Sequence, residues 1–314
     1  MSIHLGGDKY TREPARADGR LPRLVQLAAD LVGKPLSECR VLDLACLEGH
    51  YALEFGLHGA EVVGIEIRDA NLVKAEFARQ ALGLENVRFV QDDVRNLSEE
   101  KYGRFDIVLC YGILYHLDAP YVLEFIHNIH DVCDRLAVFE SFVSIKDEVS
   151  VDFRGKQYAG RYYVEHDEDA DAKTKASDLF ASIDNVRSFW LTLPSLLNLL
   201  TDAGFSTVYD ALVPHYPGQM GDRPTLVAVK GRAEKVLSSP VTADFDLGRQ
   251  PEIQRIEIHP TNVEYGWMHR TAKRILPQSV KDAIKPALRA VGLLHADPTP
   301  EGIIEHRDHQ SRKS

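Results

Sequence analysis

The sequence predicts an α/β fold with a doubly wound, mostly parallel seven-stranded sheet and an antiparallel edge strand. Three observations predict it. Short apolar runs alternate with amphipathic segments between residues 40 and 142, a rhythm typical of parallel strands joined by helices. The rhythm breaks after Phe142 and resumes at Leu193, which indicates an insertion. Two further strand-like runs flank the linker 214–218, which contains Pro and Gly and suits an antiparallel pair.

Each expected element follows from the spacing of its apolar residues. Leu24, Leu27 and Leu31 recur at helical spacing, and Gly33 followed by Pro35 ends this first helix. Compact apolar runs predict buried strands in the same way. The helices expected are 21–32, 50–57, 71–82, 121–132 and 193–203. The strands expected are 40–44, 61–67, 87–91, 105–111, 136–142, 207–213 and 225–229.

This order of elements predicts a division into domains. Residues 1–37 form an N-terminal helical lead-in, 38–232 the main domain, and 233–314 a C-terminal extension of broken helices. The polar segment 144–192 leaves after the fifth expected strand and returns before the next helix. That is the position of an inserted lid over a substrate site.

Size and charge limit the classes of protein to which the chain can belong. A chain of 314 residues with 44% hydrophobic content can bury a large core. The net charge of −10 disfavours a nucleic-acid partner, because the phosphate backbone is itself negative. The four cysteines form no CxxC pair, so reduced thiols are expected. No apolar signal segment or run of about 18 apolar residues is present, which predicts a cytoplasmic protein without a transmembrane segment.

Polar residues at the ends of the expected strands predict a nucleoside site, because the carboxyl ends of parallel strands meet in one crevice. Asp43 and Gly49 frame the first strand-to-helix turn, whose backbone N–H groups suit a carboxylate. Glu66 ends the second strand, where an acidic side chain can accept both hydroxyls of a ribose. After the third strand, Asp93 is favoured to bind an adenine amino group, and Asp92 is the next choice.

Taken in order, the strand-end motifs of residues 38–143 resemble those of class I, Rossmann-like methyltransferases. The segments LACLEGHYALEF, CYGILYHLDAP and FWLTLPSLLNLLTDAGF are similar to a subgroup with the tRNA wobble-uridine carboxymethyl-transferring enzymes and bacterial small-molecule methyltransferases. The resemblance implies S-adenosylmethionine as the cofactor. The residues expected around this cofactor are Asp43, Ala45, Cys46, Leu47, Gly49, Glu66, Ile67, Asp92, Asp93, Val94 and Cys110.

The chain departs from these families at two places. Ala45 and Leu47 stand where the methyltransferases carry glycine, so we expect Leu47 to avoid the left-handed backbone region or to point away from the ligand. A dinucleotide pyrophosphate would need those glycines more than S-adenosylmethionine does. Leu117 and Asp118 stand where the wobble-uridine enzymes carry basic residues, which disfavours a carboxylated cofactor and a tRNA substrate.

Methyl transfer from a sulfonium needs alignment and exclusion of water, and it needs a base only for a weakly acidic acceptor. His116, just after the fourth strand, is the candidate base, with packing against the next helix as the alternative. Tyr111 is expected to face the methyl group or to fill the core. The residues expected to contact the substrate are Tyr115, Tyr158, Arg161, Tyr162 and His166. An oligomerisation arm is the alternative role for their segment.

Two charged segments of the chain each allow more than one interpretation. The acidic run 165–169 has the composition of a metal site, but such runs are usually solvated faces, so no metal is expected. The basic segment 267–290 suits docking on the domain or on a second copy of the chain. Peripheral contact with a membrane surface is the alternative for this segment.

The function predicted is transfer of the methyl group of S-adenosylmethionine to an oxygen, or less favourably a nitrogen, of a small-molecule or glycan acceptor. Methylation of an RNA base, such as a tRNA uridine, is one alternative. A nucleotide-binding pseudoenzyme that keeps the nucleoside site without turnover is the other.

Overall fold

The computed structural model describes residues 3–6, 9–11, 20–178, 181–211 and 221–231. The chain divides into two compact units, and all described residues except Gly221 belong to the first, which comprises Met1–Pro214 and Asp222–Ile256. The helices expected in 233–314 and the strand end expected at 212–213 lie outside the described residues.

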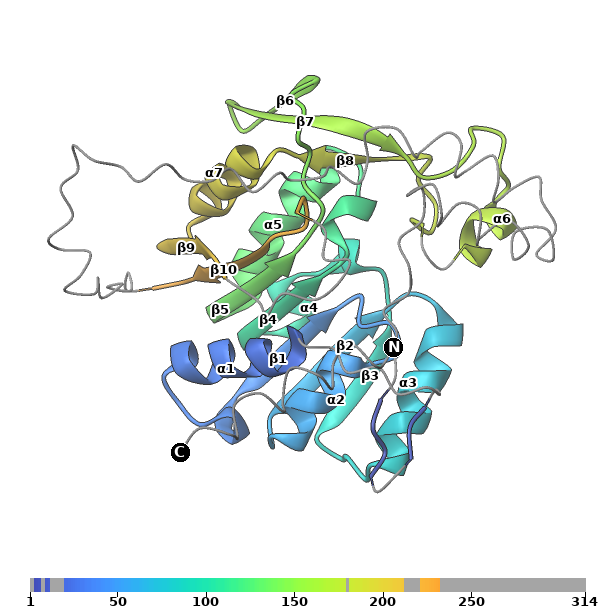
Figure 1. The fold of residues 1–314 in the computed structure, drawn as a ribbon, viewed down its shortest axis with the longest axis vertical. Coiled ribbons are helices and arrows are strands. Elements are labelled where there is room, and N and C mark those ends of the chain that lie inside the picture. Colours follow the sequence, from blue (N-terminus) through green and yellow to red (C-terminus); the bar gives the residue numbers. More distant parts are fainter. Residues whose placement is uncertain (1–2, 7–8, 12–19, 179–180, 212–220, 232–314) are drawn as a thin grey trace, which may run out of the picture. The chain divides into compact units, whose positions relative to one another are not determined.

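Seven strands form the main sheet: β1 (Arg40–Leu44), β2 (Glu61–Glu66), β3 (Val87–Gln91), β4 (Phe105–Tyr111), β5 (Cys133–Glu140), β9 (Thr207–Asp210) and β10 (Thr225–Val229). Their order is β3-β2-β1-β4-β5-β10-β9 (Figure 1). β1 pairs in parallel with both β2 and β4, so the chain winds outward from the centre in both directions. β10 is antiparallel to its neighbours β5 and β9. The predicted fold class is confirmed, and the antiparallel strand lies one place in from the edge.

Helices cover both faces of this sheet. The helices are α1 (Arg20–Val32), α2 (His50–Leu57) and α3 (Asp69–Ala81) on one face, and α4 (Glu99–Tyr102), α5 (Tyr121–Val132) and α7 (Leu193–Ala203) on the other. Successive strand residues point to opposite faces, so the neighbours Val41 and Leu42 belong to different hydrophobic clusters. Because both faces are buried, the central strands consist of continuous apolar runs.

Short turns set the positions of the groups that follow each strand. The 3₁₀ turns are η1 (Leu36–Glu38), η2 (Val94–Asn96) and η3 (Leu114–His116). η2 follows β3 and η3 follows β4, so both lie at the carboxyl edge of the sheet. α2 begins directly after Gly49, whose φ of 81° is in the left-handed region. A Cβ at Gly49 would lie 2.6 Å from the ring of Phe89, so this close approach requires glycine.

The segment between β5 and α7 forms a second, three-stranded antiparallel sheet. Its elements are β6 (Val149–Phe153), β7 (Lys156–Val164), α6 (Ala172–Ser177) and β8 (Arg187–Leu191). The backbone N–H of Phe189 donates to the carbonyl of Leu117 (2.9 Å), and that of Ser144 donates to Leu191 (2.8 Å). Phe189 and Leu191 are buried in the same cluster as the apolar faces of α5 and α7. The insertion is therefore packed onto the main sheet layer along β8.

Two findings concern membrane-spanning helices and the state of the cysteines. Within the described ranges, no helix combines the length and the apolar content needed to cross a bilayer. Cys39, Cys46, Cys110 and Cys133 are all buried free thiols.

Candidate active site

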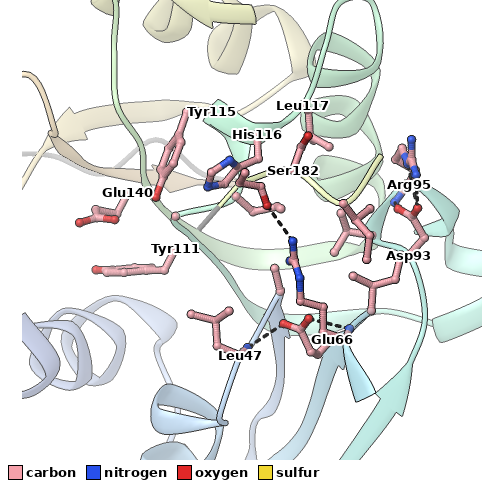
Figure 2. A pocket seen from close by; sticks show the side chains of 18 of the residues that line it. Leu47, Glu66, Asp93, Arg95, Tyr111, Tyr115, His116, Leu117, Glu140 and Ser182 are labelled. Atoms are coloured by element: carbon pink, nitrogen blue, oxygen red, sulfur yellow. Dashed lines mark hydrogen bonds and ion pairs between the residues drawn. The ribbon is translucent and has the colours of Figure 1, made fainter. Parts of the chain in front are cut away.

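The carboxyl ends of β1, β2, β3 and β4 open into one cavity. Nine of the predicted site residues line it: Ala45, Leu47, Glu66, Ile67, Asp93, Val94, Tyr111, Tyr115 and His116. Leu47 and Glu66 face Tyr115 and His116 across this space (Figure 2). The cavity thus has one end at the β1–β2 edge and another at the turn after β4.

The turn after β1 has an unusual backbone for its sequence. Ala45 has a φ of 53° and Leu47 a φ of 50°, so both residues adopt the left-handed conformation that glycine favours. The expectation that Leu47 avoids this region is wrong. The turn keeps the backbone path of a glycine-rich loop, and each non-glycine residue there costs about 1–2 kcal/mol of conformational energy.

Replacing Ala45 by glycine is therefore expected to raise the free energy of unfolding by about 0.5–1 kcal/mol, since relief of the left-handed strain exceeds the added chain entropy. The matched control is Ala29→Gly, the same change at an exposed position inside α1. It should lower stability by about 1 kcal/mol. Urea unfolding of both variants measures the difference. A loss of stability at position 45 equal to that at position 29 would show that this turn is not strained.

Glu66 is a buried carboxylate at the β1–β2 end of the cavity, with only 1% of its surface exposed. Its Oε2 accepts the backbone N–H of Leu47 (3.0 Å), and its Oε1 accepts that of Arg68 (2.8 Å). Each carboxylate oxygen can accept two hydrogen bonds, so both retain a free lone pair. Glu66 therefore shapes the turn after β1 and still offers two acceptors to a ligand.

The two aspartates after β3 have different surroundings. Asp93 lines the cavity, caps η2 by accepting the N–H of Arg95, and also pairs with the guanidinium of that residue. Asp92 does not line the cavity. Burial alone would raise its pKa, but hydrogen bonds from Lys101, Tyr102 and Asn96 outweigh this and lower the pKa to about 2. Lys101 and Tyr102 belong to α4 and Asn96 to η2, so these bonds occupy the Asp92 carboxylate outside the cavity. Asp93 is therefore the better placed of the two predicted ligands.

Four other predicted cofactor residues lie beneath the cavity rather than in its lining. The Oδ2 of Asp43 accepts the backbone N–H of Ala52 (3.0 Å) in the first turn of α2. Cys46 and Cys110 are buried thiols whose pKa values are raised well above the ordinary value, chiefly by burial. Gly49 packs against Phe89. These residues support the strand ends that reach the cavity.

Aromatic and charged residues line the end of the cavity opposite the β1–β2 edge. The rings of Tyr111 and Tyr51 lie 4.8 Å apart, and both residues line the space. Glu140, at the end of β5, accepts from Arg20 (2.7 Å) and Arg223 (2.8 Å). Burial is the largest cause that raises the pKa of Tyr115, with Arg223 opposing it. Tyr115 is therefore a neutral phenol that can donate a hydrogen bond but is a poor base.

His116 lines the cavity beside Tyr115, with ring centroids 4.3 Å apart. Its Nδ1 lies 3.1 Å from Oε1 of Glu165, which follows β7 in the insertion. The His116 side chain is 19% exposed and the Glu165 side chain 2%. A ring nitrogen is thus bonded to a buried carboxylate while the ring itself reaches the cavity.

The four insertion residues predicted to contact substrate lie outside the lining. Tyr158 is buried, with its hydroxyl donating to Asp202 (2.8 Å). The Arg161 guanidinium lies 4.8 Å from the Trp190 ring, and Tyr162 packs on Phe189. Arg161 and Tyr162 thus pack against β8 within the small sheet, whereas Tyr158 joins this sheet to α7. His166 is buried, and its Nε2 lies 2.7 Å from the carbonyl oxygen of Ser182.

The part of the insertion that does line the cavity is the loop 181–185. Two arginines from the strand ends hold this loop. Arg68 donates to the carbonyls of Asp178 (2.9 Å) and Ala181 (2.8 Å), and Arg95 pairs with Asp184 (2.6 Å). Arg68 and Arg95 follow Glu66 and Asp93 by two residues each. The turns that carry the predicted cofactor ligands therefore also position this wall of the cavity.

Several residues that line the cavity are not among those predicted from the sequence. They are Arg20, Tyr51, Arg68, Arg95, Gly112, Ile113, Leu117, Glu140, Arg223 and the loop 181–185. Glu140 carried a usable signal, because it ends the apolar run LAVFE and the carboxyl ends of parallel strands bind ligands. Arg223 carried none, since it reaches the cavity only through the pairing of β10 with β5.

The acidic run 165–169 divides into two parts. Glu165 is buried under the cavity wall, whereas Glu168 and Asp169 are exposed. Among the residues that the structure describes, no three His, Cys, Asp or Glu side chains are grouped to hold a metal ion.

Comparison with known families identifies this arrangement. Residues 35–148 match the family model described as "Methyltransferase domain". They form a class I methyltransferase domain. The match covers β1 to β5 and hence every strand whose end lines the cavity. The match confirms the predicted methyltransferase domain for residues 35–148.

Similar proteins agree with this assignment. The ubiquinone biosynthesis O-methyltransferase of Acinetobacter baumannii (strain AYE) is 31% identical over 101 residues, which are 32% of this chain and 40% of that protein. The Azotobacter vinelandii protein of the same name is 35% identical over 91 residues, 29% and 38% of the two chains. The chain thus matches about two fifths of the length of these relatives. The N-terminal domain of EvdMO1, solved in the presence of SAH and D-fucose, has the same fold, with a TM-score of 0.54, 24% identity, and 72% and 91% coverage.

The residues of the methyltransferase domain fit S-adenosylmethionine. Glu66 is buried with free lone pairs on both oxygens, as two ribose hydroxyls require. The left-handed backbone at Ala45 and Leu47 gives the turn the path of a glycine-rich loop, and both residues line the cavity. Asp93 and Val94 line the same cavity, where an adenine can meet a carboxylate and a backbone amide.

Proposed function

We propose that the chain transfers the methyl group of S-adenosylmethionine to an oxygen atom of a small-molecule or glycan acceptor in the cytoplasm. One observation carries the proposal: His116, bonded through Nδ1 to Glu165, lines the same cavity as Glu66 and Asp93. A neutral alcohol oxygen is a weak nucleophile until a base removes its proton, whereas a neutral amine nitrogen can attack through its lone pair without such help. A histidine at the acceptor end therefore supports an oxygen acceptor.

In the proposed mechanism, Glu66 holds the ribose hydroxyls, and Asp93 and Val94 hold the adenine. When bound, S-adenosylmethionine supplies an electrophilic methyl carbon, with which a lone pair of the acceptor oxygen forms a C–O bond while the electrons of the C–S bond remain on sulfur. His116 accepts the acceptor proton and releases it to solvent. Tyr111 and Tyr115 exclude water and align the acceptor.

Three further points support the choice of acceptor. The relatives that match at 31% and 35% identity are both O-methyltransferases by name. Tyr115, Glu140 and Arg223 add a phenol, a carboxylate and a guanidinium at the acceptor end, groups that suit a molecule with several hydroxyls. The net charge of −10 disfavours an RNA acceptor.

We propose the corresponding division of the chain. Residues 1–37 lead into the methyltransferase domain of 38–232, and the insertion 144–192 forms its acceptor-side wall through the loop 181–185. The extension 233–314 has its own role, of docking on the domain or on a second copy of the chain.

Calorimetry and a transfer assay test the proposal. The full-length protein should bind S-adenosylhomocysteine and S-adenosylmethionine but not NAD. Methyl-labelled S-adenosylmethionine should then label an oxygen of a catechol, 3,4-dihydroxybenzoate, or of methyl glycosides, and leave a tRNA anticodon stem-loop unlabelled. Binding of NAD alone would refute the cofactor assignment, and label on the RNA would support the base-methylating alternative. Cofactor binding without turnover on any probe would favour a pseudoenzyme.

A further inference from the structure

The bond between His116 and Glu165 joins two parts of the chain that lie far apart in sequence. His116 ends η3 after β4, and Glu165 follows β7 in the insertion. Within the described part of the chain, Nδ1 is the ring nitrogen of His116 with a hydrogen-bond partner, and Nε2 has none. The ring is partly exposed and lines the cavity, so Nε2 is open to a small molecule.

Every other contact of the Glu165 carboxylate comes from a hydrogen-bond donor. Oε1 accepts from the hydroxyl of Ser188 (2.8 Å), and Oε2 accepts from the backbone N–H of Ser182 (3.2 Å). Among described residues, no lysine or arginine pairs with it. A buried carboxylate without a cation is costly unless donors surround it. Glu165 therefore requires a donor from His116 as well, which places the hydrogen on Nδ1.

The groups around Glu165 also fix the position of its carboxylate. The indole N–H of Trp190 donates to the carbonyl of Tyr115 (2.9 Å) and to Ser188 Oγ (3.2 Å). The Ser188 hydroxyl can then give its hydrogen to Glu165. The backbone N–H groups of Glu165 and His166 both donate to the carbonyl of Val186. The position of the carboxylate is thus set by backbone contacts and by a directed chain of donors.

We propose that Glu165 is a positioning residue that holds His116 with Nδ1 protonated and Nε2 free to accept the proton of the acceptor hydroxyl. Its buried charge also stabilises the imidazolium that forms when Nε2 takes the proton. The inference rests on the proposed function for the proton that is transferred, but the tautomer itself is a property of the protein alone. The insertion therefore contributes to the chemistry as well as to the cavity wall.

Glutamine at position 165 gives a sharp test. The Ser182 N–H can only donate, so it must pair with the amide oxygen of the glutamine. The amide NH₂ then faces His116 and Ser188, where Oε1 lay before. Nδ1 of His116 must accept this hydrogen bond, and the ring proton moves to Nε2. Glu165→Gln should therefore invert the tautomer while keeping the size of the side chain.

The measurement is a histidine ¹⁵N–¹H long-range correlation spectrum of the full-length protein without acceptor, at a pH where the ring is neutral. A His116→Gln variant assigns the resonances. The wild type should show a protonated Nδ1 and a bare Nε2, and Glu165→Gln the reverse. Glu168→Gln, an exposed change in the same acidic run, should leave the spectrum unchanged. An Nε2-protonated ring in the wild type would overturn the proposal even if Glu165→Gln failed to fold.

A second readout separates this inference from the proposed function. On a hydroxyl probe that the wild type methylates, Glu165→Gln should lower kcat by about tenfold or more, with the Kd for S-adenosylhomocysteine unchanged. Equal loss in Glu168→Gln, or an inverted tautomer with wild-type kcat, would refute the catalytic role of Glu165. If no probe is methylated, the proposed function fails while the spectra still decide the positioning of His116.

Discussion

Replacing Glu66 by alanine is expected to weaken binding of S-adenosylhomocysteine by about 10- to 100-fold, which corresponds to about 1.4–2.8 kcal/mol. The loss has two sources. The ribose hydroxyls lose their acceptors, and the N–H groups of Leu47 and Arg68 lose the carboxylate that holds them at 3.0 and 2.8 Å. The turn after β1 then no longer presents its amides in a fixed position. Isothermal titration calorimetry measures the change.

Two variants make this expectation specific. Glu66→Gln keeps one acceptor oxygen for two N–H donors, so its affinity should lie between those of the wild type and the alanine variant. Glu61→Ala removes a carboxylate at the exposed start of the same strand, where the side chain is 59% exposed, and should bind normally. An affinity unchanged by Glu66→Ala would show that the ligand does not use the end of β2.

The strand positions followed from the sequence where apolar runs have sharp ends. β3 and β4 begin and end at the predicted residues, because charged or turn-forming residues flank both runs. β5 begins at Cys133, three residues before the expected start, because Asp134 and Arg135 interrupt its apolar pattern. Arg135 nevertheless belongs there, since its guanidinium donates to the carbonyls of Leu31 and Lys230. A polar residue can thus occupy a strand when backbone groups satisfy it.

The sequence predicts which residues lie at the strand ends, but it does not predict which of their side chains point into the cavity. Asp92 and Asp93 are adjacent, and only the local contacts of Asp92 with Lys101, Tyr102 and Asn96 decide which one reaches the cavity. The left-handed backbone conformation of Ala45 and Leu47 could not be predicted from the sequence either. Local preference opposes a left-handed conformation there, and the tertiary structure overrides it.

The insertion side of the cavity depends on long-range packing. The polar aromatic residues of the insertion have types common in substrate sites, yet Tyr158 bonds to Asp202 of α7 and Tyr162 packs on Phe189 of β8. The residues that reach the cavity come from the loop 181–185, whose sequence is unremarkable in type but which Arg68 and Arg95 hold in place. Such contacts join residues about 90 to 110 positions apart, and no local periodicity records them.

The buried carboxyl group of Asp43 should make the stability of the protein depend on pH. Its pKa is raised to about 7, chiefly by burial; the Ala52 N–H opposes this rise, and the charge of Glu66 adds to it. In the unfolded chain the pKa of an aspartate is about 3.9. The folded protein therefore binds a proton at Asp43 between about pH 4 and pH 7 that the unfolded chain has released. The stabilisation from this proton is complete below about pH 4 and is lost as the pH rises through about 7.

Asp43→Asn should remove this pH dependence, because the amide is neutral at every pH and its oxygen can still accept the Ala52 N–H. The free energy of unfolding of the variant, minus that of the wild type, is expected to increase by up to about 4 kcal/mol between pH 4 and pH 8. Urea unfolding at several pH values gives this difference, and most of the increase should fall between pH 4 and pH 7. A difference that stays constant across this range would mean that Asp43 is ionised in the folded protein, and that the charge at the centre of the sheet is stabilised by its surroundings.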